Sequence, residues 1–301
     1  MKIDSPSKQY IVLVLLALVW GSSFILMKRG LESFTSIQVA EYRLFIAGIT
    51  LLPFALKNIR RFPKKRKEQV GVLFVALFGN FFPAFLFSEA QTQLPSGVTG
   101  MLNSLVPLFT LIIGFLFFKS KVLIRQVIGV VIGLIGAITL IYFTSNSDGS
   151  IPIGYSVMVL VASLCYAISL NTIKAWLHDV PSVMITSFAF MILGPFVTIG
   201  LFAEGFWEVA FSSPSHLSSL GYITLLGVLG TALAVLMFNE LVKFTTAVFA
   251  SSVTYLIPIV AMAWGIVDGE ELSFSHGVGM ILILVGVYIV NRKKKVVSNW
   301  K

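Results

Sequence analysis

Ten stretches of this chain are apolar and about 20 residues long, which is the length that a helix needs to cross the hydrocarbon core of a bilayer. Only 12% of the 301 residues are charged, and the mean hydropathy is +0.93. A soluble domain carries roughly 25% charged residues, so most of this chain cannot face water. We therefore expect an all-α integral membrane protein. The ten segments are centred near Leu18, Ala47, Gly79, Phe109, Ile132, Ser163, Ile192, Leu229, Val260 and Leu282.

The basic residues predict how the segments are oriented. If the N-terminus is cytoplasmic, 19 of the 22 Lys and Arg residues fall in or beside cytoplasmic connections, including the basic tail 292–301. This bias follows the positive-inside rule and predicts a plasma membrane (bacterial inner membrane) protein with both termini in the cytoplasm. A net charge of +9 favours nucleic-acid binding in a soluble protein. Here the basic residues orient the chain and contact anionic lipid, so nucleic acid is not an expected partner.

The chain repeats itself. The stretch Ser96–Pro107 resembles Ala247–Pro258, and each is followed by a glycine, a short charged turn and a glycine-marked apolar segment. Further landmarks align at offsets of 151 or 146 residues: Gly79 with Gly230, Glu89 with Glu240, Trp20 with Tyr166, and Lys28 with Lys174. Five helices is an odd number, so the second copy enters the membrane inverted. The sequence predicts two inverted five-helix repeats, 10–142 and 152–291.

Polar and small residues recur on one face of the fourth and ninth segments, and prolines at Pro107 and Pro258 free backbone carbonyls there. Lipid cannot satisfy such groups, so these faces point at protein or at a watered cavity. For Asn103, Thr254 and Tyr255, cavity lining and helix packing are equally favoured interpretations. In the third segment, Asn80 is followed by Phe81 and Phe82 and then by Pro83, which indicates a helix that is broken at depth. The candidate substrate-binding residues are Trp20, Asn80, Asn103, Tyr166, Thr254 and Tyr255.

Ionisable residues inside membrane segments are costly and are candidates for function. Glu41 and Arg43 lie two residues apart and so face different sides of one helix. For Arg43 a structural tie to a carbonyl and the binding of an anionic substrate group both remain open. Glu89 and Glu240 occupy equivalent repeat positions near opposite membrane faces, which favours a gate-like or structural role over a shared proton relay. Proton coupling through Glu41 or Glu89 is left open.

Glycines mark the fifth and tenth segments, at Gly129, Gly133 and Gly136 and at Gly279 and Gly286. Small residues let helix backbones approach closely. These segments are expected to pack against other helices of the chain, with the face of a homodimer as the alternative. The single cysteine and three dispersed histidines give no metal-binding spacing, so neither a metal nor another cofactor is expected.

These landmarks together resemble the drug/metabolite transporter superfamily, specifically permeases built from two EamA-type domains. The likeness rests on Trp20-Gly21 with Lys28, the helix around Arg43, Phe87-Ser88-Glu89-Ala90, the Pro107 and Pro258 helices, and Gly269-Glu270-Glu271-Leu272. The resemblance implies ten helices, inverted repeats and a central cavity lined by the first, third, fourth, sixth, eighth and ninth helices. One departure is Lys119-Ser120-Lys121, where the first domain often has an acidic turn.

The resemblance also implies transport of small metabolites, often amino acids and usually outward. We therefore expect a permease that works by alternating access. One rival is an intramembrane enzyme, which needs a catalytic constellation at membrane depth that the sequence does not contain. The other is a membrane receptor or scaffold, which needs a sizeable domain outside the membrane.

Overall fold

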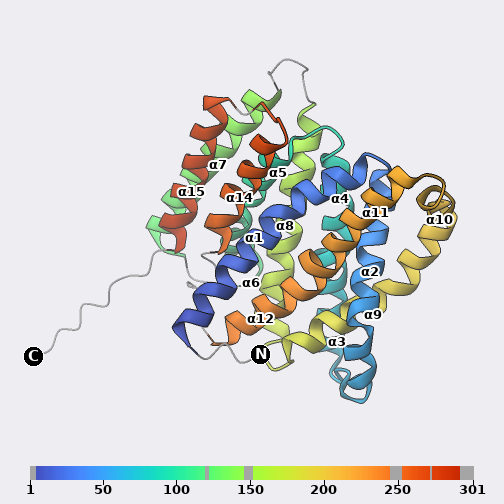
Figure 1. Cartoon of the computed structure of the whole chain (residues 1–301). Helices are drawn as coiled ribbons and strands as arrows, with labels where there is room; N and C mark the ends of the chain where they lie inside the picture. Colours follow the sequence, from blue (N-terminus) through green and yellow to red (C-terminus); the bar gives the residue numbers. More distant parts are fainter. Residues whose placement is uncertain (1–4, 119–121, 146–151, 245–252, 272, 292–301) are drawn as a thin grey trace, which may run out of the picture.

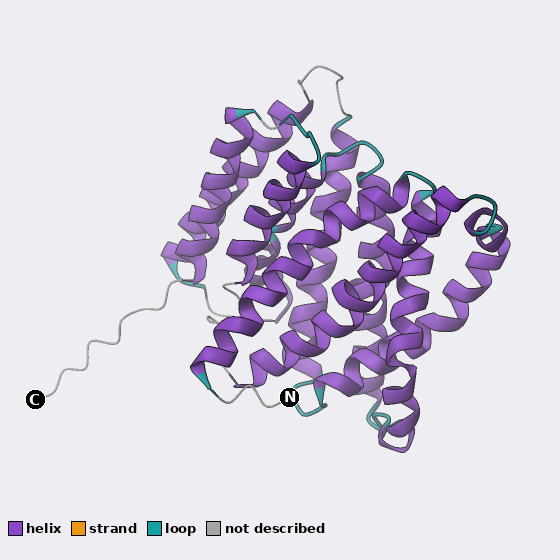
Figure 2. Cartoon of the chain, viewed as in Figure 1, coloured by secondary structure: helices purple, strands orange, loops and turns teal. Residues whose placement is uncertain are grey.

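The computed structural model describes residues 5–118, 122–145, 152–244, 253–271 and 273–291, and the regular elements in these ranges are all helices (Figures 1 and 2). The ten expected segments are present. They are α1 (Pro6–Leu31), α2 (Ser36–Lys57), α3 (Arg66–Ala76) with η2 (Leu77–Phe81) and α4 (Phe82–Ala90), α5 (Ser96–Asn103) with α6 (Val106–Phe118), α7 (Ile124–Ser145), α8 (Ile153–Trp176), α9 (Ser182–Ala203), α11 (Pro214–Leu225) with η3 (Leu226–Leu233) and α12 (Ala234–Phe244), α14 (Val253–Val267) and α15 (Phe274–Asn291).

Eight of these segments are long and apolar enough to cross a membrane, and α14 and α15 are shorter apolar helices. Two short helices, η1 (Ile59–Arg61) and α10 (Phe206–Ala210), lie in connections. The basic tail, the Lys119-Ser120-Lys121 turn and the first half of the second repeated stretch (247–252) lie outside the described residues.

The third segment is widened at depth where the sequence predicts a break. Its central turn, η2, is a π-helix, and the Asn80 side-chain amide donates to the Val75 carbonyl oxygen at 3.0 Å, five residues back. The eighth segment contains the matching π-helix η3, in which the Thr231 hydroxyl donates to the Leu226 carbonyl oxygen at 3.2 Å. In each widened turn, a side chain thus donates to a backbone carbonyl whose usual α-helical bond is redirected. Lipid offers no other donor for such a carbonyl.

The fourth segment is interrupted before Pro107. Helix α5 ends at Asn103, and α6 begins at Val106, so the proline lies in a first turn where its missing N–H costs little. In the ninth segment, α14 continues through Pro258 as one helix. The expectation of a proline-disturbed helix therefore holds for the first repeat's proline, whereas Pro258 lies within a continuous helix.

The helix contacts recur in pairs, as two repeats predict. Helix α1 packs on α14, and its repeat mate α8 packs on α6; α2 packs on α9, and α7 packs on α15. Close approaches recur as well. A Cβ atom added at Gly79 would lie 2.6 Å from Ser169 Oγ, and one added at Gly230 would lie 2.7 Å from Ser23 Oγ.

Helices α7 and α15 stand side by side at one edge of the bundle (Figure 1). A Cβ at Gly129 would lie 2.7 Å from the Gly286 carbonyl oxygen, and a Cβ at Gly136 would lie 2.8 Å from the Gly279 carbonyl oxygen. The glycines therefore serve the packing of one repeat's last helix against the other's. Of the two expectations for these glycines, the structure supports packing within the chain.

Replacing Gly286 by alanine is expected to destabilise the protein by about 1–3 kcal/mol, because the new Cβ would lie 2.6 Å from the Gly133 nitrogen and the backbones would have to separate. The measurement is the melting temperature of the purified protein in detergent. Gly277→Ala, on the same helix with nothing within 4 Å of the added Cβ, is the control. Equal melting temperatures for the two variants would contradict this account of the helix pair.

Candidate functional site

A cavity of about 270 Å³ lies at the centre of the bundle. Its walls come from helices of both repeats, and its lining is mostly apolar with a few polar side chains. The six helices implied by the resemblance all contribute. Helices α2 and α9 also contribute. Arg43 of α2 was a candidate for binding an anionic group, whereas Leu44 of α2 and Ser182, Ile185 and Thr186 of α9 were not predicted.

Five of the six candidate binding residues line this cavity: Trp20, Asn80, Asn103, Tyr166 and Thr254. Tyr255 does not belong to the lining, because its hydroxyl donates to the Val287 carbonyl oxygen of α15 at 3.1 Å. Adjacent residues on a helix point about 100° apart, so Thr254 can line the cavity while Tyr255 faces a neighbouring helix. The structure thus places Thr254 at the cavity and Tyr255 in helix packing.

The aromatic walls are fixed by hydrogen bonds and ring contacts. The Trp20 indole N–H donates to the Gly230 carbonyl oxygen at 3.0 Å, and its ring centroid lies 5.1 Å from that of Phe238. The Tyr166 ring stacks on Phe87 with centroids 5.9 Å apart. Because Gly230 lies within η3, the tryptophan completes the bonding of a widened turn while presenting its ring to the cavity.

Asn103 lies at the end of α5, next to the interruption of the fourth segment. Its side-chain oxygen Oδ1 is buried without a hydrogen-bond partner in the described structure. A buried acceptor that stays unpaired costs free energy, roughly 1–3 kcal/mol. This oxygen is therefore suited to accept a hydrogen bond from a donor group of a solute in the cavity.

Arg43 is the one charged side chain in the cavity lining that the structure describes. Its Nε donates to the Thr231 hydroxyl at 2.9 Å, and the Tyr166 hydroxyl is a second polar neighbour of its guanidinium. No carboxylate pairs with it among the described residues. The sequence left two interpretations open for Arg43. The structure does not show the tie to a backbone carbonyl, because the polar groups beside the guanidinium are hydroxyls.

Of the candidate gating acids, Glu41 and Glu89 lie outside the cavity lining. Glu41 is buried against Gly200 of α9, and its Oε2 has no hydrogen-bond partner in the described structure. Glu89 accepts a hydrogen bond from the Ser36 hydroxyl at 2.5 Å. Glu240 lies on α12, and its side chain is outside the described set. Glu41 and Arg43 do face different sides of α2, as their spacing predicts, and a role in gating or coupling stays a prediction for the three acids.

An ion-pair cluster that the sequence did not predict lies at the end of α1. Lys28 Nζ lies 2.6 Å from Asp268 Oδ2 and 2.9 Å from Glu270 Oε1, and Arg29 pairs with Asp268 as well. The side chains of Asp268 and Glu270 are 7% and 4% exposed. The signal in the sequence was present, since Lys28 and the acidic turn were both landmarks, but 240 residues separate the partners.

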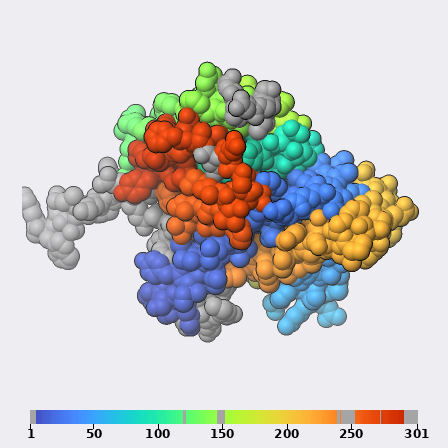
Figure 3. Space-filling model, turned by 45° about the horizontal axis from the view of Figure 1, so that its top comes forward, coloured from blue at the N-terminus to red at the C-terminus, as the bar shows by residue number. Residues whose placement is uncertain are grey.

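Glu270 also holds the first turn of α5. Its carboxylate accepts hydrogen bonds from the backbone N–H of Ser96 at 2.7 Å and of Gly97 at 3.0 Å. A helix N-terminus favours a negative charge, so the acid is held by two N–H groups and one ammonium. This cluster ties together α1, α5 and the turn after α14, which lies directly against α1 on the surface (Figure 3).

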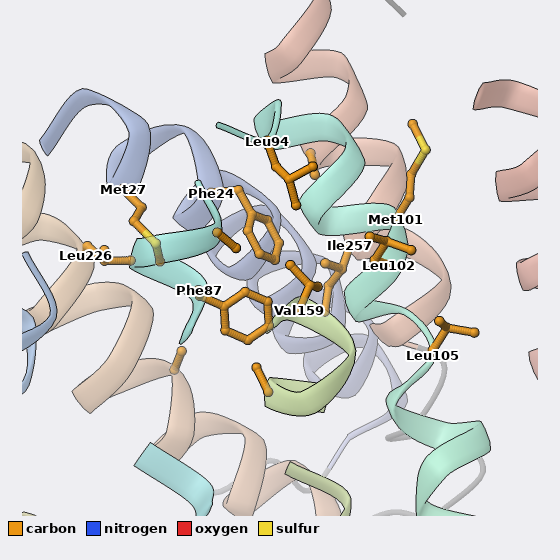
Figure 4. Packing of buried hydrophobic residues seen from close by; sticks show 14 of the residues in the cluster. Phe24, Met27, Phe87, Leu94, Met101, Leu102, Leu105, Val159, Leu226 and Ile257 are labelled. Carbon is orange, nitrogen blue, oxygen red and sulfur yellow. The ribbon is translucent and has the colours of Figure 1, made fainter. Parts of the chain in front are cut away.

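Between this cluster and the cavity lies an apolar layer. Phe24, Met27 and Phe87 line the cavity and are buried, and Phe24 meets Phe87 edge to face with centroids 6.0 Å apart (Figure 4). At its opposite end the cavity lining includes Ser182, the first residue of α9. The cavity lining thus runs from Met27, the residue before Lys28 of the cluster, to Ser182 at the start of α9.

A bundle of apolar helices with inverted repeats and a central cavity that carries a few polar side chains defines a multi-pass membrane transporter. The model of the EamA-like transporter family matches the chain twice, over residues 7–142 and 153–292, and the chain belongs to this family. One solved crystal structure aligns with a TM-score of 0.60 at 16% identity, covering 95% of this chain and 96% of that one, which supports the fold.

Curated relatives span nearly the whole chain. An uncharacterized transporter of Archaeoglobus fulgidus is 27% identical, with 95% of this chain and all of the relative aligned. The uncharacterized inner membrane transporter YedA of Escherichia coli K12 is 28% identical over 93% of this chain and 89% of its own. A probable amino-acid metabolite efflux pump of Salmonella typhimurium is 24% identical over 92% of each chain.

Proposed function

We propose that this chain is a permease that exports a small metabolite, such as an amino acid, by alternating access through the central cavity. The observation that carries the proposal is the cavity itself, which is lined by helices of both repeats and whose lining runs from Met27 of α1 to Ser182 of α9. The Salmonella typhimurium relative, named as an amino-acid metabolite efflux pump, supports this substrate class and direction.

The orientation follows from charge. With both termini in the cytoplasm of a bacterial inner membrane, the basic connections are inside and the Lys28–Glu270 cluster is at the outer face. The cavity then extends toward the cytoplasm, where an exporter loads its substrate. Release to the outside requires the outer ion-pair cluster and the Phe24–Phe87 layer beneath it to separate.

The proposed activity moves a solute without changing its covalent structure, so the chain is not an enzyme. Purified protein in liposomes distinguishes the three classes considered. A permease releases a preloaded solute chemically unchanged, an enzyme yields a product, and a receptor or scaffold does neither. Flux measured with and without an imposed pH gradient then separates proton coupling from facilitated diffusion.

Replacing Asn103 by leucine is expected to lower transport by roughly tenfold, because a buried acceptor for the solute is replaced by an apolar group. The measurement is the initial efflux rate from proteoliposomes at equal protein content. Tyr255→Phe, which removes a hydroxyl outside the cavity lining, is the control and should retain transport. Full transport by Asn103→Leu would remove this residue from the site.

Glu270→Gln is expected to open the outer face, because the amide loses the attraction of Lys28 and can accept fewer of the α5 N–H bonds. The measurement uses a Cys165→Ser background with Met27→Cys in the outer part of the cavity, labelled in spheroplasts by a membrane-impermeant maleimide. Labelling should be several-fold faster in Glu270→Gln. The control is Glu271→Gln, an exposed neighbour in the same turn; equal rates for the two variants would contradict a closing role for the cluster.

A further inference from the structure

We propose that Arg43 binds the carboxylate of the substrate, so that the permease selects small organic molecules bearing a carboxylate and an apolar body. This inference rests on the proposed transport function and adds the chemical class of solute that the cavity accepts. It starts from a charge that the described structure leaves without a counter-ion.

Arg43 lies in the interior of the bundle, about two turns from the start of α2 at Ser36. Its side chain is half-buried at the cavity wall, where a guanidinium attracts an opposite charge more strongly than it does in bulk water. The nearest acid on the same helix, Glu41, faces Gly200 of α9 instead. None of the ion pairs among the described residues includes Arg43. The anionic group of a ligand would therefore supply the counter-ion that Arg43 lacks there.

The two hydroxyl partners position the guanidinium without neutralising it. The Thr231 hydroxyl accepts from Nε at 2.9 Å and itself donates to the Leu226 carbonyl oxygen, so its orientation is fixed by η3. The Tyr166 hydroxyl provides the second contact from α8. Arginine carries further N–H donors in a planar fork that matches a carboxylate. A side chain held by Nε leaves its Nη end for such a ligand.

The remaining cavity walls define the rest of the solute. No acidic residue occurs in the cavity lining that the structure describes, so nothing there favours a cation over an anion. Trp20, Phe24 and Phe238 provide apolar surface, and the volume of about 270 Å³ is at the small end for ligand sites. These properties suit a small monocarboxylate with an apolar side chain. Both an amino acid and the matching oxo acid present this group.

Four related probes separate the contributions of the carboxylate and the amino group of the solute: leucine, 4-methyl-2-oxopentanoate, leucinamide and isopentylamine. Binding is measured as the ligand-induced shift of the melting temperature of the purified protein, which does not depend on transport. The wild type is expected to bind leucine, 4-methyl-2-oxopentanoate or both, and to bind leucinamide and isopentylamine at least tenfold more weakly. Which of the two carboxylates binds more tightly identifies the amino acid or the oxo acid as the source.

Arg43→Gln supplies the decisive comparison. We expect it to weaken carboxylate binding about tenfold or more while leaving leucinamide binding unchanged, because the amide does not need a cation. A residue with only a structural role would weaken both probes equally. Arg43→Lys, which keeps the charge without the fork, should lie between wild type and Arg43→Gln, and Arg125→Gln, outside the cavity lining, should match wild type.

Three results would overturn the inference: no binding of either carboxylate by the wild type, equal binding of leucine and leucinamide, or a parallel loss of both probes in Arg43→Gln. These outcomes are separate from failure of the proposed function. A protein that moves leucinamide or isopentylamine as well as leucine across liposomes is still a permease, although Arg43 is then not its carboxylate site. Selective carboxylate binding without any flux would retain the site and remove the transport proposal.

Discussion

The absence of hydrogen-bond partners in lipid is the constraint on which the rest of this structure depends. Straight α-helices meet it on their own, but they leave little space between them. The third and eighth segments instead contain the widened turns η2 and η3, whose redirected carbonyls are bonded by Asn80, Thr231 and Trp20. All three side chains also line the cavity. The residues that keep the backbone satisfied are therefore the same ones that give the cavity its polar surface.

The ion-pair cluster at the end of α1 likewise serves two purposes. One carboxylate, Glu270, holds the first turn of α5 and receives the ammonium of Lys28. Breaking a buried pair by removing one partner costs about 3–5 kcal/mol, whereas rearranging both partners into water costs much less. A cluster of this kind stabilises a closed face and can still separate as a whole. The apolar layer of Phe24, Met27 and Phe87 beneath it excludes water while it is closed.

The ten helices and their doubling could be predicted because hydropathy and spacing are local or periodic signals. Placing Asn80, Asn103, Tyr166 and Thr254 at a cavity was also within reach, since polar residues at mid-depth need partners. Three features of the structure could not be predicted from the sequence. Around Asn80 and Pro83, a π-helical turn and a broken helix give the same sequence signal. Thr254 and Tyr255 are adjacent and differ only in the direction in which the helix points them. The Lys28–Glu270 pair joins residues that are far apart in the sequence.

The repeat explains which of these features carry specificity. Gly79 with Ser169 mirrors Gly230 with Ser23, and Asn80 bonded to Val75 mirrors Thr231 bonded to Leu226, so the scaffold of the cavity is symmetric. Arg43 breaks that symmetry, because the offset of 146 residues places an alanine, Ala189, at its repeat position. A scaffold that is required to form two equivalent halves constrains both copies alike. A charge that is present in only one copy is not needed to form that scaffold. Because Arg43 lies at the cavity, its charge can instead determine which solute binds there.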